Sequence, residues 1–142
     1  YYKMAVMSDP GEVINILQQA GRTTVTFNRR PERFLKIGER FVDVRNGSIL
    51  TNPTKYTAKP IIEVSGGGSG IITVGRRTIE IKNITNTITI DSELQEAYSD
   101  GINQNGNIIA PDGLPILEAG ENVISYSGGI TNVTISPRWW TI

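Results

Sequence analysis

The sequence predicts a mainly β protein, in which an antiparallel β-sandwich follows a small strand-helix-strand segment. Two observations predict this class. From residue 61 onward, short runs alternate apolar and polar side chains, which is the period of a strand with one buried face. Stretches rich in glycine, asparagine and proline separate these runs, and such residues favour turns. One segment near the N-terminus has the spacing of a good amphipathic helix.

The predicted helix covers residues 9–21. Asp9 suits the N-cap, Pro10 suits the first helical position, and Glu12 follows Asp9 at the spacing of a capping box. Gly21 is expected to end the helix. The apolar stripe of this helix consists of Val13, Ile14, Ile16, Leu17 and Ala20.

Strands are predicted at residues 2–7 and 22–28, on either side of the helix. A further short strand is predicted at residues 40–44, and the pair Asn46-Gly47 predicts a turn after it. The chain begins with Tyr1 and enters a strand-like run at once, so we expect a fragment of a longer protein.

A connector is predicted at residues 51–59, which contain one proline, two lysines and few apolar side chains and are followed directly by Pro60. We therefore divide the chain into an N-terminal part, residues 1–54, and a β-sandwich domain, residues 55–142.

The sandwich domain is expected to contain six antiparallel strands, with turns at Gly66–Gly70 and Gly128–Gly129 among others. A phosphate cradle would need a helix after its glycines, whereas a strand is predicted after Gly70, so we interpret Gly66–Gly70 as a hairpin loop. The six predicted strands are residues 61–64, 71–74, 78–81, 84–90, 122–126 and 130–135.

The chain contains no cysteine and no histidine. This composition excludes thiolate nucleophiles, disulfides, Ser-His-Asp relays and zinc sites with nitrogen and sulfur ligands. No apolar run approaches the roughly 18 residues of a membrane helix, which predicts a soluble, folded chain with no membrane partner.

Charge is distributed unevenly along the chain. Residues 1–58 carry nine basic and five acidic side chains, a net +4, and residues 59–142 carry five basic and nine acidic, a net −4. Opposite net charges on the two modules favour head-to-tail contact between copies of the chain. Salt screens this attraction beyond about 8 Å. The basic cluster lacks the interleaved aromatic residues of a nucleic-acid face, so no nucleic-acid partner is predicted. This cluster consists of Arg29, Arg30, Arg33, Lys36 and Arg40.

Asp91 and Glu93 stand two residues apart at the end of a predicted strand. Two carboxylates on one face are the pair that a glycosidase uses. An Asp-Ser-Glu run at a strand end is more often a cap that leads into a turn. We favour the cap and predict no enzyme activity. We also predict no metal at residues 100–107, because Ile102 occupies a position where a calcium loop needs an oxygen.

Trp139 and Trp140 are adjacent, so in a strand their rings would face opposite ways. The favoured interpretation is that one ring closes the sandwich core and the other lies on a neighbouring loop. The alternative is a carbohydrate-binding module that recognises cell-wall glycans through either tryptophan, Tyr126 and the Asn-rich loop.

The run FNRRPERF at residues 27–34 and an ordered series of stretches between Asn52 and Arg138 resemble the distal tail proteins of phages with long non-contractile tails and of related prophages. Residues 27–34 (FNRRPERF) are similar to the end of that family's N-terminal tube-ring domain. The other similar stretches are Asn52–Thr54, Ala58–Ile62, Val64–Gly68, Ile90–Glu93, Tyr98, Leu117, Gly120, Asn122, Ile124–Tyr126, Val133, Ile135 and Pro137–Arg138.

The resemblance implies a galectin-like C-terminal sandwich and a hexameric ring in the full-length protein. Residues 1–54 would then be the last part of the tube-ring domain together with the connector. Such a ring joins the major tail tube protein to the tail tip or baseplate, which carries receptor-binding proteins. The implied location is the virion tail tip, and the bacterial cytoplasm during assembly. No catalytic, cofactor-binding or metal-ligating residue is implied, and no cofactor.

Overall fold

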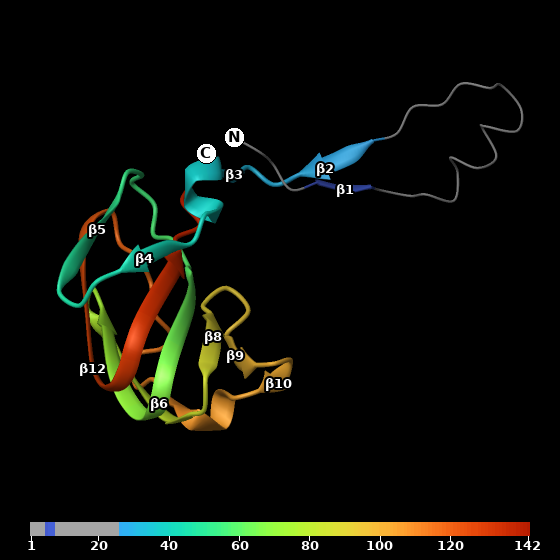
Figure 1. Ribbon diagram of the computed structural model, residues 1–142. Helices are drawn as coiled ribbons and strands as arrows, with labels where there is room; N and C mark the ends of the chain where they lie inside the picture. Colours follow the sequence, from blue (N-terminus) through green and yellow to red (C-terminus); the bar gives the residue numbers. More distant parts are fainter. Residues whose placement is uncertain (1–4, 8–25) are drawn as a thin grey trace, which may run out of the picture.

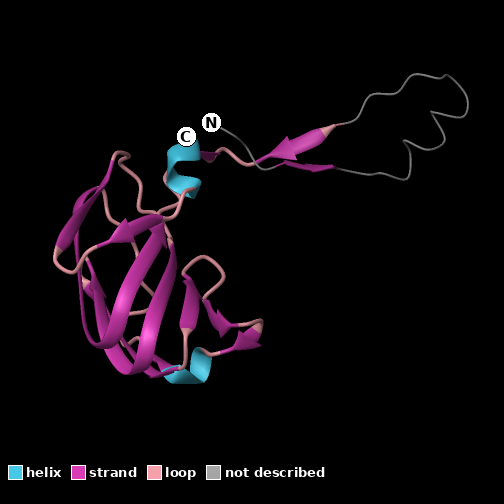
Figure 2. Ribbon diagram, in the orientation of Figure 1, coloured by secondary structure: helices cyan, strands magenta, loops and turns pink. Residues whose placement is uncertain are grey.

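The computed structural model describes residues 5–7 and 26–142, and strands dominate them (Figure 2). All the strand pairs in these residues are antiparallel. The predicted mainly β class is therefore confirmed, and the arrangement is that of a β-sandwich. The predicted helix at residues 9–21 lies outside the described residues.

The elements follow one another along the chain as shown in Figure 1. The strands are β1 (Ala5–Met7), β2 (Phe27–Arg29), β3 (Arg33–Phe34), β4 (Val42–Val44), β5 (Ser48–Asn52), β6 (Ile61–Val74), β7 (Arg77–Ile84), β8 (Thr87–Asp91), β9 (Glu96–Ser99), β10 (Ile102–Asn103), β11 (Ile108–Ile109), β12 (Gly120–Ser136) and β13 (Trp140–Thr141). Two 3-10 helices are also present in the described residues, η1 (Lys36–Glu39) and η2 (Asn105–Asn107).

Two long strands, β6 and β12, run side by side through the whole sandwich (Figure 1). Their pairing extends from Ile124 opposite Val74 to Ser136 opposite Ile61. One end of this ribbon is flanked by β5 and β7, and the other end is flanked by β4 and β8. Beyond these, β9 and β10 continue from β8, and β11 pairs with β7. A single bent ribbon therefore builds both layers.

The glycine clusters mark the bend of this ribbon. A Cβ on Gly66 would overlap the carbonyl oxygen of Gly129, and a Cβ on Gly129 would overlap that of Gly67. The pairing register also shifts between Gly128 and Ile130, as at a β-bulge. Strands that change sheets in a β-sandwich commonly do so at such bends.

The predicted turns at Gly66–Gly70 and Gly128–Gly129 are therefore wrong. Each cluster lies inside one continuous strand, β6 or β12. The predicted strands 61–64 and 71–74 are the two halves of β6, and the predicted strands 122–126 and 130–135 are two parts of β12. Glycine is typical of a close approach between two backbones as well as of turns. In β6 and β12, close approach explains the glycine clusters.

The opposite error occurs at residues 84–90, which were predicted as one strand. The chain turns there, since β7 ends at Ile84 and β8 begins at Thr87. Asn83 has a φ of 55°, a left-handed conformation that asparagine tolerates better than most residues. The short strands β9, β10 and β11 were not predicted, because two to four residues are too few to show a period.

The predicted turn at Asn46-Gly47 is present, but it does not reverse the chain. Both β4, before it, and β5, after it, are antiparallel to β12 and lie along the same edge of the ribbon. The side chain of Asn46 accepts a hydrogen bond from the backbone N–H of Tyr126, and the N–H of Gly47 donates to the carbonyl of Ile124.

The two strands β4 and β5 precede the predicted boundary at residue 54 but pair with β12, so they belong to the same sheet as the strands after that boundary. In the N-terminal part, β1 pairs with β2. β1 lies within the predicted strand 2–7, and β2 overlaps the end of the predicted strand 22–28. The assignment of residues 1–54 to a tube-ring domain stays a prediction.

Alternating side chains from both layers form the core. Each buried aliphatic side chain contributes roughly 1.5–3 kcal/mol relative to an exposed one. None of the helices in residues 5–7 and 26–142 has the length and hydrophobicity needed to cross a membrane. The largest fully buried side chains are Ile62, Val64, Ile72, Val74, Ile79, Ile81, Ile84, Ile88, Ile90, Leu117, Ile124 and Ile135.

We expect Gly129→Ala to lower the free energy of unfolding by at least about 2 kcal/mol, because the added methyl group meets a backbone carbonyl that a bent ribbon cannot easily move. Urea denaturation measures the change. The matched control is Gly67→Ala, since a Cβ there meets nothing within 4 Å. This control should retain its stability or gain less than about 1 kcal/mol. Equal effects of the two substitutions would contradict the close approach.

Candidate functional site

Asp91 ends β8, and its buried carboxylate accepts four hydrogen bonds. Its carboxylate accepts two hydrogen bonds from Arg138, from Nη1 to Oδ1 at 2.7 Å and from Nη2 to Oδ2 at 2.9 Å. Oδ1 also accepts the backbone N–H groups of Glu93 at 2.9 Å and Leu94 at 3.1 Å. The Asp91 side chain is only 4% exposed and that of Arg138 is 27% exposed. This is a bidentate, charge-assisted contact of the stronger kind.

Two opposing effects set the pKa of Asp91. Burial of the carboxyl group raises the pKa, since it disfavours the charged form. The hydrogen bond and positive charge of Arg138, together with the N–H groups of Leu94 and Glu93, lower the pKa by more. The net pKa lies below the ordinary value of 3.8, so Asp91 is a carboxylate at neutral pH.

The predicted cap at Asp91 is confirmed, because its carboxylate holds the turn that begins with Ser92. Glu93 is 54% exposed and forms a surface ion pair with Lys59, with 3.1 Å between Oε2 and Nζ. A glycosidase needs one carboxyl group with a raised pKa to act as an acid. Asp91 has a lowered pKa, and its oxygens already have partners, so the arrangement suits a structural ion pair.

Arg138 adopts an unusual backbone conformation, with a φ of 56°. A non-glycine residue in this region carries strain of order 1–3 kcal/mol. The strain persists because contacts hold the residue on two sides. Its side chain binds Asp91, and its N–H donates to the carbonyl of Gly38 at 2.7 Å. The sequence alone did not indicate this pairing, because Asp91 and Arg138 are 47 residues apart.

The two adjacent tryptophans have different surroundings. Trp139 is 4% exposed and belongs to the hydrophobic core. Trp140 stacks on Tyr56, with ring centroids 4.5 Å apart and planes inclined by 22°, and its Nε1 donates to the carbonyl of Thr57. This confirms the favoured interpretation, in which one ring closes the core and the other lies on a neighbouring loop. Tyr56 was not predicted to take part.

The Asn-rich loop uses its own side-chain oxygens internally. Asn105 Oδ1 accepts the N–H of Ala97 at 2.6 Å, and Asn103 Oδ1 accepts the N–H of Asn105 at 2.9 Å. Gln104 Oε1 accepts a hydrogen bond from Asn107. Within the part of the chain that the structure describes, no three histidine, cysteine, aspartate or glutamate residues gather as metal ligands.

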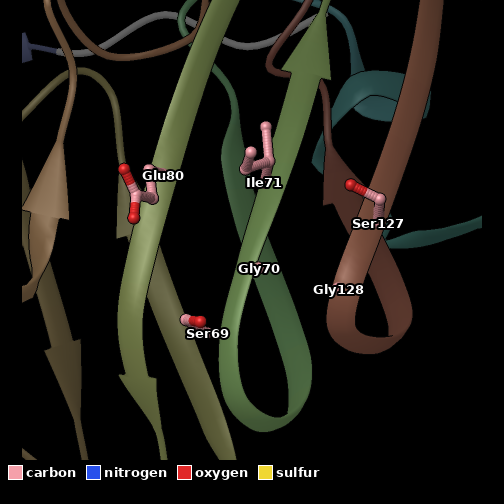
Figure 3. A pocket seen from close by; sticks show the side chains of 6 residues that line it. All are labelled: Ser69, Gly70, Ile71, Glu80, Ser127 and Gly128. Carbon is pink, nitrogen blue, oxygen red and sulfur yellow. The ribbon is translucent and has the colours of Figure 1, made fainter.

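A shallow groove of about 160 Å³ lies on the sandwich surface beside the glycine bend (Figure 3). Its volume is below the roughly 300–1,000 Å³ of typical small-molecule sites. Its polar side chains are those of Glu80 and two serines. The groove is lined by Ser69, Gly70, Ile71, Glu80, Ser127 and Gly128.

No protein-family model, no curated protein and no solved structure matches this chain. The resemblance to phage distal tail proteins therefore stays a prediction.

We expect Arg138→Ala and Asp91→Asn each to lower the free energy of unfolding by about 2–3 kcal/mol. Removal of one partner leaves the other charge poorly compensated, and the partial exposure of Arg138 keeps the loss below that of a fully buried pair. Urea denaturation of Glu93→Gln is the control, because the exposed pair with Lys59 contributes less than about 1 kcal/mol. A control as destabilised as Asp91→Asn would contradict this assignment.

The stability difference between the wild type and Asp91→Asn should depend on pH. A carboxyl group with a lowered folded-state pKa stabilises the fold above its unfolded-state pKa, and this contribution is lost as pH falls through the folded-state pKa. Urea midpoints should therefore differ at pH 7 and converge as pH falls from about 4 toward 2. A difference that stays constant over this range would show that the charge of Asp91 is not what stabilises the fold.

Proposed function

We propose that this chain is a structural scaffold, the C-terminal part of a phage distal tail protein. The proposal assigns residues 55–142 to a galectin-like β-sandwich and residues 1–54 to the end of a tube-ring domain with its connector. The full-length protein would form a hexameric ring between the tail tube and the tail tip or baseplate, and anchor receptor-binding components there. The mechanism is geometric: the symmetry of the ring fixes the position of each sandwich domain that projects from it.

The distribution of exposed side chains around β2, η1 and β4 is the observation that carries this proposal. Phe27, Ile37 and Phe41 are 50%, 70% and 47% exposed, although they are large and apolar. The basic side chains of Arg30, Arg33, Lys36 and Arg40 are exposed beside them in the sequence. Exposed apolar residues with basic neighbours favour an interface with another protein, here one with an acidic surface.

The chemistry of the side chains supports a scaffold as well. The sequence has no histidine or cysteine, and Asp91 is the one buried acidic residue in residues 5–7 and 26–142. Its carboxylate holds a turn and an arginine. A scaffold needs rigid placement and no reactive group.

No observation on the described residues favours the carbohydrate-binding alternative. Trp139 is buried, and one face of the Trp140 ring is stacked on Tyr56. Tyr126 directs its hydroxyl group to the carbonyl of Val44. The aromatic side chains named for glycan stacking are thus engaged within the protein.

We expect the longer protein to be a hexamer by size exclusion with light scattering, and the present chain to be a smaller species. The reason is that the proposal places most of the ring contacts in the tube-ring domain before this chain. A longer protein that stays monomeric at high concentration would contradict the ring. Binding of that monomer to a cell-wall glycan array would then favour the carbohydrate-binding module.

A further inference from the structure

The C-terminal residues contact the segment before the sandwich through a series of backbone bonds. β13 pairs with β3, placing Trp140 opposite Phe34 and Thr141 opposite Arg33. The N–H of Leu35 donates to the carbonyl of Trp139 at 2.8 Å. Residues 33–39, including all of η1, are thus attached to residues 138–141.

The carbonyl of Gly38 receives two donors from the same side. The N–H of Arg138 donates to it at 2.7 Å, and the hydroxyl group of Ser136 donates to it at 3.2 Å. The Ser136 hydroxyl group also lies 3.1 Å from the carbonyl of Glu39. These contacts attach η1 to the end of β12.

Shape complementarity accompanies the hydrogen bonds. Gly38 is buried, and a Cβ there would overlap the backbone nitrogen of Trp139 and lie 3.0 Å from its Cβ. Trp139 in turn belongs to the hydrophobic core of the sandwich. The backbone of η1 therefore packs directly against Trp139, whose side chain is held in the core of the sandwich.

Two contacts fix the C-terminal residues to the sandwich itself. Arg138 binds Asp91 at the end of β8, and Trp140 stacks on Tyr56 and donates to Thr57 in the loop before β6. Terminal segments are poorly ordered unless they are tied down in this way.

We propose that residues 137–142 are a clasp that holds residues 33–39 against the sandwich, and that the Asp91–Arg138 pair locks this clasp. The clasp sets the direction in which the chain before residue 33 leaves the sandwich. The proposal concerns contacts within the chain and does not depend on the scaffold function.

The test is amide hydrogen exchange on the wild type, Asp91→Asn and the control Glu93→Gln, with the amides of β6 and β12 as an internal reference. In the wild type, the amides of residues 33–39 and 138–141 should exchange faster than those of β6 and β12, because the clasp opens without unfolding of the core. In Asp91→Asn these amides should exchange at least tenfold faster still, and those of β6 and β12 should speed up only as far as the free energy of unfolding falls. Glu93→Gln should match the wild type. The proposal would be overturned if the amides of residues 33–39 and 138–141 exchanged as slowly as those of β6 and β12 in the wild type, or if they did not exchange faster in Asp91→Asn.

A second variant keeps the proposal testable if Asp91→Asn does not fold. Trp140→Leu removes the ring that stacks on Tyr56 and leaves Trp139 in the core. Trypsin cleavage after Lys36, whose side chain is exposed, should be faster in this variant by threefold or more. Wild-type cleavage rates in a folded Trp140→Leu protein, with unchanged exchange at residues 33–39, would refute the clasp.

Discussion

The close approach of β6 and β12 at their bend is the constraint on which the rest of the structure depends. Gly66 and Gly129 bring two backbones together where any side chain would collide with a carbonyl oxygen. Because both strands bend there, each contributes to both layers, and the flanking strands find their partners along the same ribbon. The core forms inside the bend, mainly from isoleucine and valine side chains of β6, β7, β8 and β12.

Much of this fold follows from local patterns in the sequence, since period-2 alternation located most of the residues that lie in β6, β7, β8 and β12. The same patterns could not identify the bend. A glycine run between two alternating segments predicts a hairpin unless the partner strand is known, and the partner of Gly66 is 63 or more residues away. Close approach of two backbones is a property of the pair, and neither stretch reveals it alone.

The polar contacts likewise divide into those that the local sequence predicts and those that it does not. The Asp-Ser-Glu run at the end of a strand predicted the cap at Asp91, because a cap is local. Arg138, the second partner of Asp91, is remote in sequence and could not be predicted. Different surroundings for Trp139 and Trp140 were predicted from strand geometry, although only Trp140 lies in a strand, β13. Which ring is buried could not be predicted, because Trp139 packs against Gly38, which is remote in the sequence.

The pairing of β3 with β13 has a mechanical consequence. Residues 33 and 141 lie opposite each other in an antiparallel pair, so a tensile force applied across them enters and leaves the molecule at one end. The first bonds to bear that load would be those of β3 with β13, opened one at a time, followed by the Asp91–Arg138 pair. The sandwich would carry no tension until they had parted. A module connected in this way can lose the pairing of β3 with β13 under load, and form it again, while its core stays folded.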